Sequence, residues 1–314
     1  MKKIFKILLY LFLLLIVIFT VLGHLGIGNV DIDEANQGEF ISIGDQQIRY
    51  LQKGNGTDFL LIHGTPGCIE DWQLIIDSLS EKYRVTAIDR LGNGFSSSND
   101  YQYTLEENSA LIHKLIDTLE LKNTVIIGHS FGGSTTAQLA TENNPKIDSY
   151  IMVSPPLYQI QPATIYKIAS IPLLGKGFAY FMHKTKAAEI IGERLKNELQ
   201  NRREFLTSEF IEYRSDLWSQ SKVLYTTSKE RINYNEGLDK ISSKYSTIPS
   251  FISIIVGDLD SEDILEGCKK FKEARPETNL VVLKNTRHFV QIERNEQLLK
   301  EIEKHLLMSQ KEKN

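Results

Sequence analysis

One short stretch, Thr124–Ser134, constrains this chain more than any other, because it passes through three conformations in a few residues. An apolar, β-branched run leads into Gly128-His-Ser-Phe-Gly132, and a segment rich in Ala, Thr and Gln follows. A serine at the tip of a strand–turn–helix unit, in the pattern G-x-S-x-G, is typical of a nucleophile elbow. The glycines are needed because strand and helix approach each other closely there. Ser130 is therefore the first candidate nucleophile.

The segments on either side of this stretch alternate between strand and helix patterns. Continuous apolar runs predict strands that are buried on both faces, while apolar residues at helical spacing predict the helices between them. Thr104 and Glu107 form a capping box that opens one of these helices. The alternation predicts a mostly parallel, eight-stranded, doubly wound sheet with helices on both faces. The expected strands lie at 40–44 and 47–52 (an antiparallel hairpin), 58–62, 83–88, 124–128, 147–153, 249–257 and 279–283, and the later helices at 105–121, 262–274 and 295–307.

A change of character divides the chain after the sixth strand. From Pro155 to about Thr247 the strand-like runs disappear and helical periodicity replaces them. We therefore expect an α/β core formed by residues 39–156 and 248–314, with a helical cap formed by residues 157–247. The last residues, 310–314, are polar and charged, and we expect them to form a frayed, solvated tail.

The N-terminus is expected to be a membrane segment. Three lysines within Met1–Lys6 precede an apolar run from Ile7 to Ile27, and no charged residue occurs before Asp31. A helix that crosses a bilayer needs roughly 20 apolar residues, and lysines at its start keep that end in the cytoplasm. We expect residues 1–30 to be an anchor, 31–38 a linker, and the rest to lie on the extracytoplasmic side. The alternative is a cleaved signal and a secreted protein, although the run lacks an A-x-A-like site.

Charge and cysteine usage exclude several other classes. The net charge of −4 and the pI of about 6.0 give no reason to expect a nucleic-acid partner. Cys68 and Cys268 are too few for a disulfide framework and have no metal-ligand spacing. A catalytic role for the Cys68 thiol lacks a histidine-paired cysteine pattern, and a single bridge between the two cysteines stays open.

Four separated motifs, each at the end of an expected strand, carry a resemblance to a known family. They resemble those of the α/β-hydrolase fold family, in particular its capped, esterase-like members, over roughly Phe40 to Leu307. The resemblance implies that the helical insertion is a lid over the active site. The motifs are His63-Gly-Thr-Pro-Gly67, Asp89-Arg-Leu-Gly-Asn-Gly94, Gly128-His-Ser-Phe-Gly132, and Gly257-Asp-Leu-Asp260 followed by Arg287-His-Phe289.

A base and an acid for Ser130 follow from the chain order Ser…Asp…His of such enzymes. Of the seven histidines, only His288 follows a strand downstream of a suitable acid. The acid must accept a hydrogen bond from the histidine and hold its orientation. The family pattern after this strand resembles G-x-x-D, which selects Asp260, with Asp258 as the alternative.

The resemblance also implies an oxyanion hole made of two backbone N–H groups, here those of Thr65 and Phe131. Pro66 has no N–H, which is consistent with Thr65 in this role. For Asp89 and Arg90 we expect a structural role as loop anchors.

A serine at the elbow argues against the haloalkane dehalogenases and epoxide hydrolases of this fold, which resemble this layout but use aspartate there. The expected activity is hydrolysis of a carboxylic ester, lipophilic in view of the anchor, through an acyl-enzyme and without a cofactor or metal. The expected partners are a small-molecule ester or lipid and the membrane. A proline-releasing aminopeptidase, a carbon–carbon bond hydrolase and a non-catalytic ligand-binding protein of the same fold are the alternatives.

Overall fold

The structure, a computed structural model, describes residues 1–29, 35, 37–98 and 101–313 of the chain. Most of the expected linker at 31–38 lies outside the described residues. Eight strands form one sheet in the order β1-β2-β4-β3-β5-β6-β7-β8. β2 pairs antiparallel with β1 and β4, and all other pairs are parallel, which confirms the expected fold class. The strands are β1 (Glu39–Ile43), β2 (Gln46–Lys53), β3 (Asp58–Ile62), β4 (Arg84–Ile88), β5 (Thr124–His129), β6 (Ile147–Val153), β7 (Ile252–Gly257) and β8 (Asn279–Leu283).

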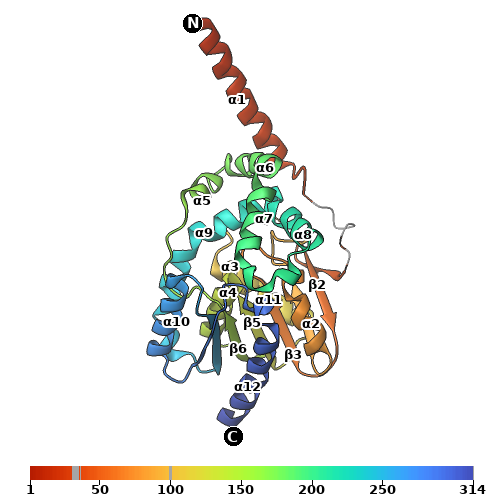
Figure 1. Cartoon of the computed structure of the whole chain (residues 1–314), viewed down its shortest axis with the longest axis vertical. Coiled ribbons are helices and arrows are strands. Elements are labelled where there is room, and N and C mark those ends of the chain that lie inside the picture. The colour runs from red at the N-terminus through yellow and green to blue at the C-terminus, as the bar shows by residue number, and fades with distance from the viewer. Residues whose placement is uncertain (30–34, 36, 99–100, 314) are drawn as a thin grey trace.

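Helices cover both faces of this sheet (Figure 1). Every residue of β3, β5 and β7 is buried, which is why these strands are apolar without a polar alternation. One apolar core lies between the sheet and α3, α4 and α10, and a second lies between the sheet and α2 and α12. The helices of this part are η2 (Ile69–Trp72), α2 (Gln73–Ser80), α3 (Leu105–Thr118), α4 (Phe131–Glu142), α10 (Glu262–Ala274), α11 (Val290–Glu293) and α12 (Asn295–Lys313).

The segment between β6 and β7 is helical, as expected, and we refer to residues 157–247 as the insertion. In Figure 1 its helices lie beyond one end of the sheet, on the side from which α1 emerges. The boundaries of the insertion as a separate domain stay a prediction. It contains α5 (Thr164–Ala169), α6 (Gly175–Thr185), α7 (Ala187–Glu198), η3 (Gln200–Phe205), α8 (Ser208–Ser219), α9 (Ser221–Ser242) and η4 (Tyr245–Thr247).

The two ends of the chain are both helical. α1 (Lys2–His24) is long and apolar enough to cross a membrane, and it overlaps the expected span. At the other end, the expected frayed tail is wrong for residues 310–313, because α12 continues to Lys313. Ser309 is buried beside this last turn, so contacts with the core extend the helix beyond its last apolar residues.

Candidate active site

Ser130 lies between the last residue of β5 and the first residue of α4. Its φ of 52° and ψ of −121° are unusual for a residue other than glycine, and such a conformation costs on the order of 1–3 kcal/mol. The Ser130 N–H donates to the carbonyl of Val153 at 2.9 Å, which holds the turn against β6. Gly132 has no room for a side chain, because a Cβ there would lie 2.3 Å from the carbonyl oxygen of Ile62. The elbow therefore has the tight geometry that its sequence pattern predicts.

His288 lies in the loop after β8 and connects Ser130 to a carboxylate. Its Nε2 is 2.9 Å from the hydroxyl oxygen of Ser130. Its Nδ1 is 3.0 Å from both carboxylate oxygens of Asp260, which follows β7. With the proton on Nδ1, the ring donates to Asp260 and accepts the proton of Ser130. The structure thus brings together the three residues that the sequence singles out for catalysis.

Asp260 and Asp258 have different surroundings. The Asp258 carboxylate accepts the N–H of Thr286 at 3.3 Å and lies 3.7 Å from the Lys284 ammonium. Burial by itself would raise the pKa of Asp260, but the charge of His288 and its hydrogen bond outweigh burial, so that this pKa is lowered. Asp260 is therefore ionised at neutral pH, as a group that orients a histidine must be.

His129 contributes to this arrangement in a way that its sequence position alone does not show. Its Nε2–H donates to the backbone carbonyl of His288 at 3.0 Å, and the two rings lie with centroids 4.9 Å apart. Burial, and then the neighbouring His288, lower the pKa of His129 to about 3. The ring is therefore neutral, and it holds the backbone of His288 without adding a competing charge.

The loop that follows β3 runs beside Ser130 and is held by Arg90. The Arg90 guanidinium donates to the carbonyls of His63 at 3.1 Å and Gly64 at 2.7 Å. In a trans peptide the C=O of one residue and the N–H of the next point in opposite directions, so the Thr65 N–H points away from Arg90. The Phe131 N–H belongs to the first turn of α4, where no intrahelical acceptor exists. A Cβ on Gly64 would lie 2.9 Å from the Cβ of Ser130, so this loop runs beside the serine, while the oxyanion role of the Thr65 and Phe131 N–H groups stays a prediction.

Arg90 also connects this loop to the insertion. Its guanidinium is paired with the carboxylate of Glu230 on α9, and both side chains are almost completely buried. The same guanidinium donates to Asn108 at 3.0 Å and lies over the Phe131 ring, 4.7 Å from its centroid. Arg90 therefore contacts the loop that contains Gly64 and Thr65, the ring of Phe131, and α9.

Comparisons with known proteins agree with this architecture. A family model described as the alpha/beta hydrolase fold matches residues 59–295. The chain belongs to this family. An enol-lactonase from Burkholderia xenovorans has a similar structure, with a TM-score of 0.70 and 18% identity over 86% of this chain and 100% of that one.

The sequence relatives of this α/β hydrolase match it over part of their length only. It is 32% identical over 124 residues (39% of this chain, 33% of the relative) to the dihydrolipoyllysine-residue acetyltransferase component of an acetoin cleaving system from Cupriavidus necator. It is 30% identical over 118 residues (36% of this chain, 41% of the relative) to 2-hydroxy-6-oxo-6-(2'-aminophenyl)hexa-2,4-dienoic acid hydrolase from Metapseudomonas resinovorans. Each match spans less than half of the curated relative, and the second of these relatives is a hydrolase.

A cavity of about 270 Å³ lies between the insertion and the serine of this α/β hydrolase. Ser130, His288 and the Gly64–Thr65 backbone line its floor, and α5 to α9 of the insertion line the rest. Most of these walls are apolar, and the exceptions are the hydroxyl-bearing Tyr166, Thr227 and Ser228 and three charged side chains, Arg194, Glu198 and Arg231. Arg231 is half-buried and donates to the carbonyl of Thr65 at 3.4 Å. No carboxylate among the described side chains is paired with it.

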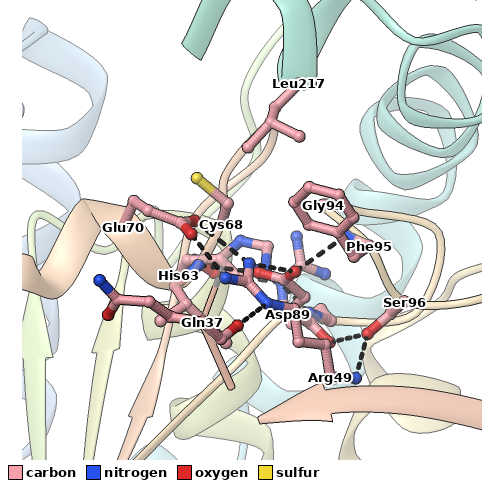
Figure 2. A network of polar contacts seen from close by, with 12 residues as sticks. Gln37, Arg49, His63, Cys68, Glu70, Asp89, Gly94, Phe95, Ser96 and Leu217 are labelled. Carbon is pink, nitrogen blue, oxygen red and sulfur yellow. Dashed lines mark hydrogen bonds and ion pairs between the residues drawn. The ribbon is translucent and has the colours of Figure 1, made fainter. Parts of the chain in front are cut away.

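Asp89 anchors the loops behind the site, as Figure 2 shows. Its carboxylate accepts the N–H groups of Ile69 at 2.8 Å and Phe95 at 2.9 Å, and it is paired with Arg49 at 3.1 Å. Cys68 lies beside this network, and burial raises the pKa of its thiol well above the ordinary value. A buried thiol that resists ionisation is a poor nucleophile. Cys268 is buried too, and the structure has both cysteines free.

Within the described residues, no group of three or more His, Cys, Asp or Glu side chains is placed to hold a metal ion.

Proposed function

We propose that this chain is a serine hydrolase that cleaves carboxylic esters, with Ser130 as nucleophile, His288 as base and Asp260 as the orienting acid. One observation carries the proposal: the continuous hydrogen-bonded chain from the Ser130 hydroxyl through His288 to Asp260, at 2.9 and 3.0 Å. A serine hydroxyl needs an adjacent base to attack a carbonyl at neutral pH. The same geometry recurs on unrelated folds wherever this chemistry is performed.

The proposed reaction has two halves. Ser130 attacks the ester carbonyl while its proton passes to Nε2 of His288, and the N–H groups of Thr65 and Phe131 stabilise the oxyanion. The alcohol leaves with the proton from His288, and the acyl group stays on Ser130. A water molecule then gives its proton to His288 and attacks the acyl-enzyme, and His288 returns the proton to the Ser130 oxygen as the acid leaves. Asp260 stabilises the protonated ring at both steps.

The surroundings of Ser130 support an apolar acyl group. The side chains of Ile165, Ala169, Phe178 and Met182 line the cavity from α5 and α6. Burial of each methylene of an acyl chain contributes about 0.8 kcal/mol to binding. We therefore assign to the insertion the role of a cap that binds the acyl chain and keeps bulk water from the acyl-enzyme.

Labelling with a fluorophosphonate probe tests the nucleophile. We expect the full chain to be labelled, Ser130→Ala to be unlabelled, and Cys68→Ala to be labelled like the original protein. A panel of p-nitrophenyl esters of increasing chain length then tests the substrate class. An unlabelled protein without esterase activity would favour a non-catalytic ligand-binding protein of the same fold, and labelling of Ser130→Ala would remove Ser130 as the nucleophile.

Arg231 favours one second candidate, a hydrolase of a carbon–carbon bond in a substrate that bears a carboxylate. An arginine that faces the cavity without a carboxylate partner among the described residues suits an anionic substrate group. The relative from Metapseudomonas resinovorans has a dienoic acid as its substrate. Under this alternative, Arg231→Met raises KM for carboxylate-bearing substrates and leaves KM for uncharged esters unchanged. The proposed esterase is favoured if both substrate types respond alike.

We also propose that α1 anchors the protein in a membrane, with the catalytic part on the extracytoplasmic side. The support is the length and apolar composition of α1 and the lysines that precede it. Mass spectrometry of the mature protein distinguishes the anchor from a cleaved signal, because only an anchored protein retains Lys2–His24. Protease digestion of intact and permeabilised cells then gives the orientation.

A further inference from the structure

The helices α5 and α6 and the loop between them carry a concentration of exposed apolar side chains. Leu173 is 71% exposed, and five further large apolar residues of this segment are at least 40% exposed. Singly exposed apolar residues are common on protein surfaces, but a contiguous group marks an interaction site. We call this group the apolar surface of the insertion; it consists of Ile165, Ile168, Ile171, Leu173, Leu174 and Phe181.

Within the segment that carries the apolar surface, the charged side chains are all of one sign. Between Asp148 and Glu189 the chain has no acidic residue, although its net charge is −4. The same segment contains four lysines: Lys167, Lys176, Lys184 and Lys186. Exposed apolar side chains flanked by lysines are typical of segments that lie at the surface of a bilayer. The pattern fits a lipid surface better than an acidic or neutral protein partner.

The position of α1 puts the apolar surface at the level of a bilayer. α1 and α6 touch backbone to backbone: a Cβ on Gly177 would lie 2.7 Å from the Cα of Thr20, and a Cβ on Gly23 would lie 2.3 Å from the carbonyl oxygen of Lys176. The Phe19 ring packs on the rings of Tyr180 and Phe181. These contacts lie within the last turns of α1, about 8 Å from its end.

A second contact fixes the segment that follows α1. The Asn29 side-chain oxygen accepts the Lys222 N–H at 3.1 Å and the Ser221 hydroxyl at 3.2 Å, so that it caps the start of α9. The insertion is therefore attached to the C-terminal end of α1 at two places. Because α6 packs against the last turns of the apolar helix, a bilayer that surrounds α1 also meets α5 and α6.

The apolar surface is continuous with the cavity that contains Ser130. Ile165 on α5 and Ile190 on α7 are both exposed to solvent and both line the cavity. Phe178 and Met182 line it from the inner side of α6, whose outer side carries Phe181. Apolar side chains of α5, α6 and α7 thus occur both on the outer surface and on the walls of the cavity.

From these observations we propose that the apolar surface of the insertion lies in the outer interface of the bilayer that α1 spans, and that the cavity receives its substrate directly from that leaflet. The substrate class is then an amphiphile with an acyl ester, such as an acylglycerol or another ester lipid. The position of the surface rests on α1 being retained as an anchor, and the substrate class rests on the proposed ester hydrolysis. The two parts are tested separately below.

Fluorescence quenching tests the position of the surface without using activity. The protein contains two tryptophans, Trp72 and Trp218, and both are buried. Leu173→Trp places a third in the apolar surface, and Leu307→Trp places one on α12, an exposed position at the opposite end of the molecule (Figure 1). The full-length variants are reconstituted in vesicles of phosphatidylcholine whose acyl chains carry bromine. We expect the added fluorescence of Leu173→Trp to fall about twofold or more, and that of Leu307→Trp to stay unchanged.

Steady-state kinetics test the route of the substrate. Leu173→Asp should raise KM for a diacylglycerol in phosphatidylcholine vesicles about tenfold, because it weakens contact with the bilayer by about 1.4 kcal/mol. It should leave kcat/KM for p-nitrophenyl acetate in solution unchanged, as should the matched control Leu307→Asp for both substrates. An equal loss for both esters, or no change in KM for the vesicle ester, would overturn the route from the leaflet.

The outcomes separate the two proposals. Quenching of Leu173→Trp in a protein that hydrolyses neither ester would retain the membrane contact and reject the proposed function. Hydrolysis of both esters without quenching at position 173 would retain the function and reject the membrane contact.

Discussion

The α/β core and the insertion enclose the same cavity, but they bury different kinds of side chain. The central strands of the core bury Ile, Leu, Val and Phe at 11 of their 17 positions. In the insertion, α5 buries only Ala169, and α6 and α7 bury mainly glycine and alanine residues. Buried small residues contribute little hydrophobic free energy. α5 and α6 therefore add little apolar packing, and the insertion is held to the core mainly through α7 to α9, whose Leu195, Trp218 and Leu238 lie in apolar clusters with core residues.

Two buried ion pairs among the described residues add polar contacts between the core and these helices. Arg90 of the core is paired with Glu230 of α9, and Asp71 of the core lies 3.4 Å from Arg214 of α8. Such pairs add little net stability compared with apolar packing, but removal of one partner leaves a buried charge uncompensated. The two ion pairs thus supplement the apolar packing of α8 and α9 on the core, whereas α5 and α6 bury few large apolar side chains.

The largest expected effect concerns the core alone. Asp260→Asn should lower kcat about 10⁴-fold, because an amide no longer holds the His288 tautomer that accepts the serine proton. Asp258→Asn is the matched control and should change kcat less than about threefold, since that residue contacts only Thr286 and Lys284 in the described part of the chain. Equal losses in the two variants, measured with a soluble ester, would contradict the assignment of the acid.

The next largest effect is expected from removal of the ion pair that connects the core to the insertion. Glu230→Gln should lower the free energy of unfolding by about 3 kcal/mol, since Arg90 is left as an unpaired buried cation. It should also lower kcat about tenfold or more, because Arg90 positions the carbonyls beside Thr65. Denaturant unfolding in detergent and ester kinetics measure the two effects. Glu189→Gln, which removes an exposed pair with Lys186, serves as the control. It should change the free energy of unfolding by less than about 0.5 kcal/mol and leave kcat unchanged.

A pH series tests one buried histidine of the core. His305 is buried between the hydroxyls of Ser149 and Ser253, and burial lowers its pKa to about 3. The unfolded chain binds a proton near pH 6.5 and the folded core does not, so this stabilisation is complete above pH 6.5 and declines as the pH falls toward 3. From pH 7 to pH 4.5 the loss is about 2–3 kcal/mol.

Replacement of His305 tests whether the free energy of unfolding falls with pH in this way. The difference in unfolding free energy between the original protein and His305→Asn should narrow by that amount over the same pH range. A difference that is independent of pH would show that His305 does not titrate differently in the folded and unfolded chain.

The smallest effect compares one helix cap in each region. Thr104 caps α3 of the core and Thr207 caps α8 of the insertion, each by accepting a backbone N–H. Replacement of either by alanine should cost about 1 kcal/mol locally. We expect Thr104→Ala to lower the global unfolding free energy, and Thr207→Ala to accelerate hydrogen exchange only in α8. Uniformly faster exchange in Thr207→Ala would show that the insertion unfolds together with the core.

The comparison also explains which features the sequence could predict. Buried strands and capped helices leave local signals, so the sheet, the Thr104 capping box and the elbow at Ser130 could be read directly from the chain. The family order of motifs then placed Asp260 and His288 in the same site, and the structure brings their side chains together, while their catalytic roles stay a proposal.

Other features depend on contacts between residues that are distant in sequence. The sequence near Glu230 does not indicate that this residue is paired with Arg90, which lies 140 residues away in the chain. The elbow motif likewise does not indicate that the His129 ring donates to the backbone carbonyl of His288. The α12 helix beyond Leu307 was missed for a similar reason, because charged residues in the last turns suggested solvent while the preceding contacts with the core extend the helix.

The helix α9 connects the segment that follows the anchor to the loop beside Ser130. α9 is capped at its first turn by Asn29, the last described residue before the gap at 30–34. Further along the same helix, the Thr227 hydroxyl lies 3.2 Å from that of Thr65, and Glu230 holds Arg90. Only about 9–14 Å of helix separates these points. α9 thus contacts the segment that follows α1 at its first turn and the Thr65 loop and Arg90 about two turns further along.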